Sequence, residues 1–453
     1  GELQVEYYPK LTTAGKTHTM QGYLRDNKNN AYGYFNLGKT LGCDGTAPTL
    51  EAQGWNNAPR YNDGNGTYWM REGDSCSWNH RGKDTESGVK RAYLKLKHKN
   101  DGDEDVASYH YSNGYNSDSR EDNSNRINIT NATEYRNDVT YLGVTYHIDG
   151  NTGDNVYDMY YYFHDRCNNG SGYTDLGVDL GIDGTAPSIT WHNTDSSWRN
   201  TVPNIYTTQS DSGSGIDTAK FAVTSSSSKP SSWSTDSSPS STYFQNTLEG
   251  KGDGEWYCHI EVTDNVGNSN WEYKVVRIDK STPSVSYDIT SKSWDNTDVS
   301  VNLTYNDSGG SGIANKYYKW STSASTPSSW NSFSSNPITQ SSEGQWYLHT
   351  KIVDNAGNSY TTYNGTYDID KTNPTISYDI TSRDWGNTDA SVNLTYSDSG
   401  GSGISTKQYK WSTSTTTPSS WNTFSSNPVT QNSEGQWYLH TRHFENNSPV
   451  TEY

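Results

Sequence analysis

Residues 278–283, Ile-Asp-Lys-Ser-Thr-Pro, return 91 residues later at 369–374 as Ile-Asp-Lys-Thr-Asn-Pro. The heptapeptide Asp-Ser-Gly-Gly-Ser-Gly-Ile at 307–313 and the tetrapeptide Trp-Tyr-Leu-His at 346–349 both recur at the same offset. A fixed offset that is shared by separate motifs is the signature of a tandem repeat. The chain therefore contains two nearly identical repeats in succession.

Two more divergent copies come earlier, and each opens with Asp-Gly-Thr-Ala-Pro, at residue 183 and at residue 44. The copy at 44 runs 139 residues before the next opening, and its surplus lies at about 100–150. The predicted domains are 1–43, the last third of a repeat or an N-terminal donor segment; 44–182, an enlarged domain with an insertion; the repeats 183–278 and 279–369; and 370–453, a repeat that lacks its last strand.

Apolar and polar residues alternate along each repeat, for example at Val299, Val301, Leu303 and Tyr305 and again along 346–352. A period of two is typical of strands that are buried on one face. Turns rich in Gly, Ser and Asn separate these runs, and no sustained helical period occurs. We therefore expect an all-β chain of tandem Ig-like β-sandwich domains in an extended rod.

The composition agrees with many small cores. Of the 453 residues only 30% are hydrophobic, yet there are 16 Trp and 36 Tyr, whose large side chains can close a small core. The net charge of −18 argues against nucleic acid as a partner. No run of about 18 apolar residues is present, so we expect no membrane span in this chain.

The order of these motifs resembles the tandem Ig-like repeats of large bacterial cell-surface and adhesin-type proteins. The resemblance is close over 183–453 and loose over 44–182. It implies secretion, an extracellular or cell-surface location, and a structural role in a surface fibre, filament or adhesin stalk. It does not imply catalysis, and we expect no enzyme activity.

Both ends carry incomplete repeats, because 370–453 stops before the strand that residues 363–368 supply one repeat earlier. Leu3, Val5 and Tyr7 alternate with polar residues in an N-terminal segment that could pair with such an open edge. One hypothesis is therefore donor-strand addition, in which this segment completes the last domain of the next subunit and builds a head-to-tail filament. The alternative is that both ends are boundaries within a longer protein.

Calcium is the cofactor hypothesis, because hard cations bind several carboxylate oxygens. Carboxylates are expected to gather at the domain junctions, and these are Asp279, Asp307 and Asp354, and their equivalents Asp183, Asp211 and Asp264. A related acidic run is Asp-Gly-Asp-Glu-Asp at 101–105. The alternative is that these Asp residues only cap loops through their own backbone.

Four cysteines without a C-x-x-C pair suggest an oxidising compartment. A bridge between Cys76 and Cys167 would lie within the enlarged domain, and Cys43 could instead pair with Cys76. Cys258 lies on an inward-facing row of a strand, where we expect a buried free thiol.

Recurring His and Trp residues have structural interpretations. His259, His349 and His440 occupy one repeat position that alternates with the inward row, so we expect them to face outward. Trp330 in Pro-Ser-Ser-Trp, and its copies, are expected to pack against strands.

An alternative function is binding of a carbohydrate or host-cell ligand by the enlarged domain 44–182. Its insertion carries Tyr109, Tyr111 and Tyr115 among acidic and Asn residues. Insertions on a rigid scaffold are where binding surfaces commonly occur.

Overall fold

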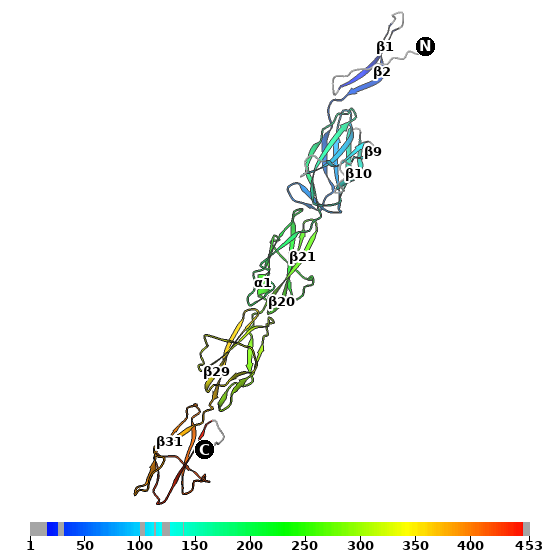
Figure 1. The fold of residues 1–453 in the computed structure, drawn as a ribbon. Coiled ribbons are helices and arrows are strands. Elements are labelled where there is room, and N and C mark those ends of the chain that lie inside the picture. The colour runs from blue at the N-terminus through cyan, green and yellow to red at the C-terminus, as the bar shows by residue number, and fades with distance from the viewer. Residues whose placement is uncertain are drawn as a thin grey trace. The chain divides into compact units, whose positions relative to one another are not determined.

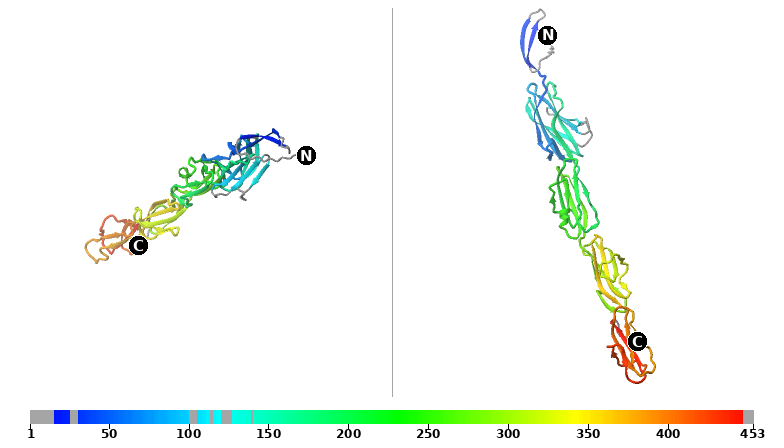
Figure 2. Two further views of the ribbon diagram at one scale, coloured as in Figure 1. Left: turned by 90° about the horizontal axis from the view of Figure 1, so that it is seen from above. Right: turned by 90° about the vertical axis from the view of Figure 1, so that its left-hand side faces the viewer.

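The computed structural model describes residues 16–25, 31–99, 105–112, 115–119, 127–138 and 140–446. Nearly every element in this part of the chain is a strand, beside one short helix, α1 (Gln245–Glu249). The all-β, β-sandwich prediction is thereby confirmed. Strands that are close in sequence gather with one another, as the separated colours in Figures 1 and 2 show. No helix among the described residues is long and apolar enough to cross a membrane.

Packing divides the chain into two compact units. The first contains residues up to 194 with 204–246 and 257–274, and the second contains 195–203, 247–256 and the residues from 275 onward. The repeat 183–278 therefore has residues in both units.

The first unit begins with a hairpin of β1 (Lys16–Arg25) and β2 (Ala31–Cys43), followed by the enlarged domain. The enlarged domain has one sheet of order β10-β11-β6-β3 and a second of order β4-β5-β13-β12-β7-β8-β9. Its strands are β3 (Thr49–Asn57), β4 (Tyr61–Asn62), β5 (Thr67–Arg71), β6 (Ser75–Lys83), β7 (Val89–His98), β8 (Asp105–Ser112), β9 (Tyr115–Ser119), β10 (Ile127–Asp138), β11 (Tyr141–Gly150), β12 (Asn155–Asp165) and β13 (Thr174–Asp183).

The surplus at 100–150 is built into both sheets of this domain. β8 and β9 extend one sheet beyond β7, while β10 and β11 extend the other beyond β6. Tyr146 and Ile148 on β11 are completely buried in the main core. The insertion is thus partly structural, whereas the sequence suggested only a polar addition to the scaffold.

Repeat 183–278 has a three-stranded sheet of order β14-β16-β19 and a five-stranded sheet of order β15-β21-β20-β17-β18. Its strands are β14 (Ser188–His192), β15 (Trp198–Arg199), β16 (Tyr206–Ser210), β17 (Ile216–Thr224), β18 (Ser234–Thr235), β19 (Ser241–Tyr243), β20 (Gly254–Asp264) and β21 (Ser269–Ile278).

Repeat 279–369 has a five-stranded sheet of order β23-β30-β29-β26-β27 and two pairs, β22-β25 and β24-β28. Its strands are β22 (Ser284–Tyr287), β23 (Lys292–Asp295), β24 (Val299–Val301), β25 (Leu303–Asn306), β26 (Ile313–Ser321), β27 (Asn331–Ser332), β28 (Ile338–Gln340), β29 (Gly344–Asp354) and β30 (Ser359–Ile369).

The alternating run from Val299 to Tyr305 is not one strand. It divides at Asn302, because the Asn302 N–H and side-chain amide both donate to the Asp288 carboxylate, at 2.8 and 2.7 Å. β24 then pairs with β28, and β25 pairs with β22. Val299, Val301 and Leu303 remain in the core, so the expected burial is confirmed although the strand is broken.

The last repeat contains β31 (Thr375–Tyr378), β32 (Ala390–Val392), β33 (Leu394–Ser397), β34 (Ile404–Ser412), β35 (Asn422–Thr423), β36 (Val429–Gln431) and β37 (Tyr438–Glu445). Its main sheet has the order β35-β34-β37. Within the described residues, β37 therefore forms the edge of this sheet, whereas β29 of the preceding repeat lies between β26 and β30.

A parallel pairing brings an early strand of each complete sandwich to its last strand. β5 pairs with β13, β15 with β21, and β23 with β30. The other pairings whose residue register is known are antiparallel, as is the isolated bridge between His164 and Gly170.

His80 on β6 is completely buried among aromatic rings, with the Tyr146, Tyr161 and Phe163 ring centroids at 4.8, 6.3 and 5.2 Å. Burial lowers the pKa of His80 to about 3. His80 in the folded domain therefore stays neutral at pH values well below 6.5, the ordinary pKa of a His side chain.

Because its folded pKa is depressed, His80 contributes a stability that is complete above about pH 6.5 and is lost as the pH falls toward 3. Lowering the pH from 6 to 4 should cost about 2 kcal/mol through this residue. His80→Phe should remove that part of the pH dependence in urea unfolding followed by Trp fluorescence. The control is His147→Gln at an exposed position of β11. An identical pH slope in wild type and His80→Phe would contradict the assignment.

Candidate cation site at the start of each repeat

The predicted Asp residues come together at the start of two repeats. Asp183 ends β13, Asp211 follows β16, and Asp264 ends β20. One carboxylate oxygen of each lies within 4.8 Å of one from each of the others. The same holds for the second predicted set, which is Asp279, Asp307 and Asp354.

A third cluster, which the sequence analysis missed, opens the enlarged domain. Asp44, Asp84 and Asp165 meet the same 4.8 Å limit. The available signal was the shared Asp-Gly-Thr-Ala-Pro opening at Asp44 and the aspartate that ends the Tyr-Tyr-Phe-His-Asp strand. The related acidic run at 101–105 lies outside the residues whose side chains the structure describes.

Backbone N–H groups surround each carboxylate. In the cluster of repeat 279–369, Asp279 accepts from the Ser281 and Ser311 N–H groups at 3.0 and 3.1 Å. Asp307 accepts from the Gly312 N–H at 2.6 Å, and Asp354 accepts from the Asn358 N–H at 2.8 Å. Each Asp therefore accepts hydrogen bonds from the backbone of a turn, as the loop-capping interpretation predicts.

Hydrogen bonding leaves some oxygens of these clusters without a partner. Asp264 Oδ2, Asp211 Oδ1 and Asp84 Oδ2 are buried and accept no hydrogen bond. Asp264 is 1% exposed and Asp84 is 5% exposed, so bulk solvent does not reach these oxygens.

Like charges at this spacing repel. Two carboxylates 4.8 Å apart interact unfavourably by about 3.5 kcal/mol at an effective dielectric of about 20. Burial raises the pKa of Asp211 and so do the Asp183 and Asp264 charges, against hydrogen bonds from the Gly215 and Gly213 N–H groups. In the described part of the chain, no Lys or Arg pairs with any carboxylate of the three clusters.

An asparagine side chain ties each cluster to the opening residue of its repeat. The amide groups of Asn268 and Asn358 donate to the Asp183 and Asp279 carbonyl oxygens at 3.1 and 2.8 Å. Asn169 does the same to the Asp44 carbonyl at 3.0 Å. Asn268 and Asn358 end the motif Asp-Asn-x-Gly-Asn at 264–268 and 354–358, whereas Asn169 ends Asp-Arg-Cys-Asn-Asn at 165–169, so only the first Asp and the last Asn are common to all three.

The last repeat has a variant of the same arrangement. Asp370 accepts from the Ser402 N–H at 2.8 Å and Asp398 from the Gly403 N–H at 2.7 Å, as in the other repeats. Glu445, at the end of β37, takes the place of Asp354. Among the described residues, this set does not form an acidic cluster of the kind found in the other three repeats.

A second recurring feature lies at the linkers between repeats. A carboxylate near the start of a long strand in one repeat accepts from the first N–H groups of the next. The Asp154, Asp253 and Glu343 carboxylates accept from the N–H groups of Gly184, Lys280 and Lys371 at 2.8, 2.6 and 2.8 Å.

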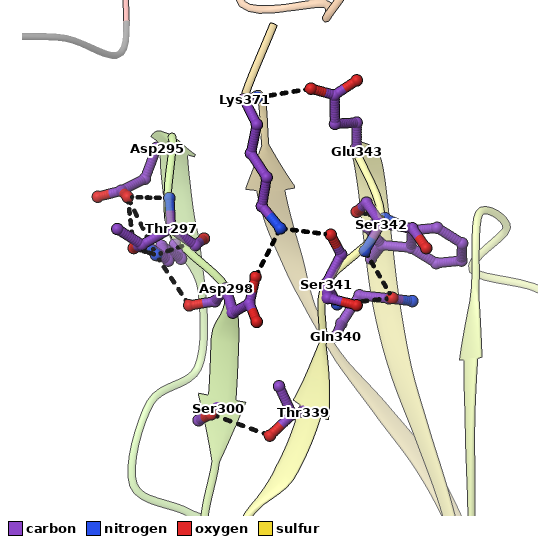
Figure 3. A network of polar contacts seen from close by, with 12 residues as sticks. Asp295, Thr297, Asp298, Ser300, Thr339, Gln340, Ser341, Ser342, Glu343 and Lys371 are labelled. Carbon is purple, nitrogen blue, oxygen red and sulfur yellow. Dashed lines mark hydrogen bonds and ion pairs between the residues drawn. The ribbon is translucent and has the colours of Figure 1, made fainter.

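Figure 3 shows the linker at Lys371. The Lys371 ammonium donates to the Asp298 carboxylate at 2.6 Å and to the Ser341 carbonyl at 2.7 Å. Its backbone N–H is held by Glu343, whose carboxylate also accepts from the Thr372 hydroxyl at 2.8 Å. The linker backbone is therefore fixed by the repeat that precedes it.

Tryptophans contact glycines of the heptapeptide loop. A Cβ placed on Gly401 would lie 2.8 Å from Cη2 of Trp294, and the corresponding distance between Gly310 and Trp198 is 3.4 Å. Both glycines also have positive φ, +112° and +99°. Gly401 is therefore required both for backbone conformation and for the close approach of the ring.

The disulfide considered between Cys76 and Cys167 is not formed, because both are free thiols, as is Cys258. Cys76 lies near the start of β6, whereas Cys167 follows Asp165, whose carboxylate meets Asp84 beyond the other end of that strand. About 25 Å of extended chain separates the two ends, against the roughly 7 Å between Cα atoms that a disulfide allows. Cys76 is thus out of reach of Cys167, whereas the side chain of Cys43 lies outside the described residues and its pairing with Cys76 stays a prediction.

Cys258 is buried, as the sequence predicted. Burial raises the pKa of the Cys258 and Cys76 thiols to about 12. Both are therefore unreactive packing residues.

His259 and His349 do not face solvent, contrary to expectation, since both are buried. In each repeat a loop covers the outer face of the sheet and contacts the imidazole. This loop follows β17 in the repeat of His259 and β26 in the repeat of His349. His259 Nε2 lies 2.9 Å from the Ser226 carbonyl oxygen, and His349 Nε2 lies 2.8 Å from that of Ser323. His440 repeats this contact with Ser414 at 2.8 Å but is less buried.

The tryptophans of the recurring Pro-Ser-Ser-Trp motif, Trp233, Trp330 and Trp421, are half-buried. Trp233 meets His259 edge-on with ring centroids 6.5 Å apart, and the Arg442 guanidinium lies 4.5 Å from the Trp421 ring centroid. Tyr109, Tyr111 and Tyr115 lie outside the described side chains, as do Leu3, Val5 and Tyr7. Ligand binding by the enlarged domain and a donor role for the N-terminal segment therefore remain predictions.

No family model matches the chain, and no curated protein matches it significantly. Among solved structures, it is similar to a tetra-tandem repeat in the extending region of a large adhesion protein, with 11% identity over 85% of this chain and 96% of that one, at a TM-score of 0.29. It is also similar to dimeric latent PorU from Porphyromonas gingivalis, with 8% identity over 76% of this chain and 36% of that one, at a TM-score of 0.17. The likeness to adhesin-type β repeats is therefore loose.

Gly401→Ala should destabilise the last repeat by about 1–3 kcal/mol, because the methyl group clashes with Trp294 and strains a residue with positive φ. The control is Gly252→Ala, where no atom lies within 4 Å of the added Cβ. Limited proteolysis with mass spectrometry should find faster cleavage after residue 370 in Gly401→Ala alone. Equal cleavage rates in both variants would contradict the contact.

Proposed function

We propose that this chain is a non-enzymatic structural segment of an extracellular or cell-surface protein, in which tandem Ig-like repeats form a stalk. The observation that carries the proposal is the linker, which has the same construction at three places. A stalk needs repeats whose spacing is maintained, and long flexible linkers would not maintain it.

The linkers are short and their backbone groups are engaged. Only residues 184–187, 279–283 and 370–374 separate the last strand of one repeat from the first strand of the next. The carboxylate of the preceding repeat accepts the first free N–H group in each case. Pro187, Pro283 and Pro374 then restrict φ just before the first strand. Few conformations remain for such a linker, which supports a spacer role.

Duplicating residues 279–369 in the full chain should increase its largest dimension by about 35–40 Å, roughly the length of an 11-residue strand with its loops. Small-angle X-ray scattering measures this dimension. The matched control is a chain in which Glu343→Ala releases the Lys371 N–H, where we expect a broader distance distribution. An unchanged largest dimension after duplication would refute the spacer role.

Antibodies to 279–369 should also label intact producing cells, and labelling that requires permeabilisation would refute the location.

A second candidate, head-to-tail self-association, is favoured by the last repeat. Within the described residues, no strand pairs with the outer edge of β37. Trp385 is 85% exposed, whereas Trp294 at the same repeat position is half-buried and belongs to β23, which pairs with β30. An open strand edge can accept an added strand, and an exposed Trp side chain can be covered by it. The donor would be the segment with Leu3, Val5 and Tyr7.

Deleting residues 1–8 should convert head-to-tail oligomers into monomers in sedimentation velocity. A synthetic peptide of residues 1–8, added to the full chain, should shorten the oligomers because it occupies the acceptor edge. A scrambled peptide of the same composition is the control. Oligomers that persist after the deletion would exclude donor-strand addition. So would a full chain that stays monomeric at about 100 μM, because its free energy of association would then be weaker than about 5.5 kcal/mol.

A further inference from the structure

The three acidic clusters have no part in the linker contacts on which the stalk proposal rests. Each brings together three carboxylates from separate strand ends: the opening residue of the repeat, the residue after a second strand, and the end of a long strand. The chain thus concentrates negative charge at the same place in three successive domains. The question is which group compensates it.

The spacing of the oxygens fits one bound cation. Oxygens that coordinate the same Ca²⁺ at 2.3–2.6 Å can lie up to about 5 Å apart, and those of each cluster lie within 4.8 Å. The ligands would come from fixed strand ends and tight turns. Mg²⁺ requires shorter distances and tends to keep several waters, which a buried cluster does not favour.

Unpartnered oxygens provide the second observation. Asp264 Oδ2 and Asp84 Oδ2 are buried atoms that accept no hydrogen bond, although the opposite oxygen of each carboxylate accepts from several N–H groups. Asp264 and Asp84 are both more than nine-tenths buried. A buried carboxylate oxygen without a donor is costly, and a metal ion both satisfies such an oxygen and compensates the charge of the surrounding carboxylates.

We propose that the chain binds two Ca²⁺ ions, one in each acidic cluster that contains such an unpartnered oxygen. Each ion joins the opening Asp of a repeat to the ends of two strands within that repeat. The sites are Asp44, Asp84 and Asp165, and Asp183, Asp211 and Asp264. Ion binding does not depend on the stalk function, since a protein with any role could use it to stabilise its domains.

The last two repeats supply an internal comparison. In repeat 279–369 every carboxylate oxygen of the cluster accepts a hydrogen bond, and Asp354 Oδ2 accepts from the Asn358 amide at 2.8 Å. In the last repeat Glu445 replaces the third Asp, and the set does not meet the distance limit in the described part of the chain. The expected number of ions is therefore two.

The test is equilibrium dialysis of the full chain, stripped with chelating resin, against about 2 mM CaCl₂, followed by elemental analysis. We expect two Ca²⁺ per chain, little Mg²⁺ under the same conditions, and a melting temperature that EGTA lowers by about 5 °C. Asp84→Asn and Asp264→Asn should each reduce the count to one. Asp354→Asn, in the cluster whose oxygens are all hydrogen-bonded, should leave it at two.

Asp288→Asn is the control, because Asp288 is an exposed carboxylate that accepts from Asn302 and lies outside the clusters. It should leave two ions bound. Near-ultraviolet circular dichroism verifies that each variant folds. A wild-type count of zero, or Asp84→Asn and Asp264→Asn variants that still bind two ions, would overturn the proposal. Neither result would affect the scattering measurement of the stalk.

Discussion

The organisation of each repeat depends on a buried aspartate that opens it. In repeat 279–369, one oxygen of Asp279 accepts from the linker N–H of Ser281 and the other from the N–H of Ser311 in the heptapeptide loop. A Cβ on Gly309 would lie 1.7 Å from Asp279 Oδ1, so the loop can pass the carboxylate only as glycine. This interaction joins linker and loop, and the acidic cluster and the Asn contact form around it.

Aromatic residues allow such small domains to close. Tyr367 is completely buried edge-on against Trp320, with ring centroids 5.4 Å apart, and its hydroxyl donates to the Ile289 carbonyl at 2.7 Å. Tyr287 places its hydroxyl 2.7 Å from that of Thr350. A tyrosine thus fills apolar space and satisfies a polar group at once, which explains how a chain with only 30% hydrophobic residues builds a series of cores.

The sequence was sufficient for what repeats and alternation determine: the all-β class, the inward row of β29, and the meeting of Asp279, Asp307 and Asp354. It was insufficient for features that depend on the path of a segment far away in the sequence. His349 is buried because a loop crosses the sheet, and a period of two contains no information about loops. Asn302 divides a strand because Asp288 is near it in space. The Cys76–Cys167 expectation failed because pairing requires a distance that spacing in sequence does not give.

The parallel pairing of β23 with β30 has a mechanical consequence. β23 lies near the start of its repeat and β30 at its end, and Lys292 and Asp295 pair with Tyr367 and Ile369. Tension applied to the two ends of the repeat pulls these strands in opposite directions along their length. The hydrogen bonds between them, including that from the Asp370 N–H to the Asp295 carbonyl, are then loaded together in shear and do not open one after another. Resistance to extension is thus concentrated in a few backbone bonds that close each sandwich.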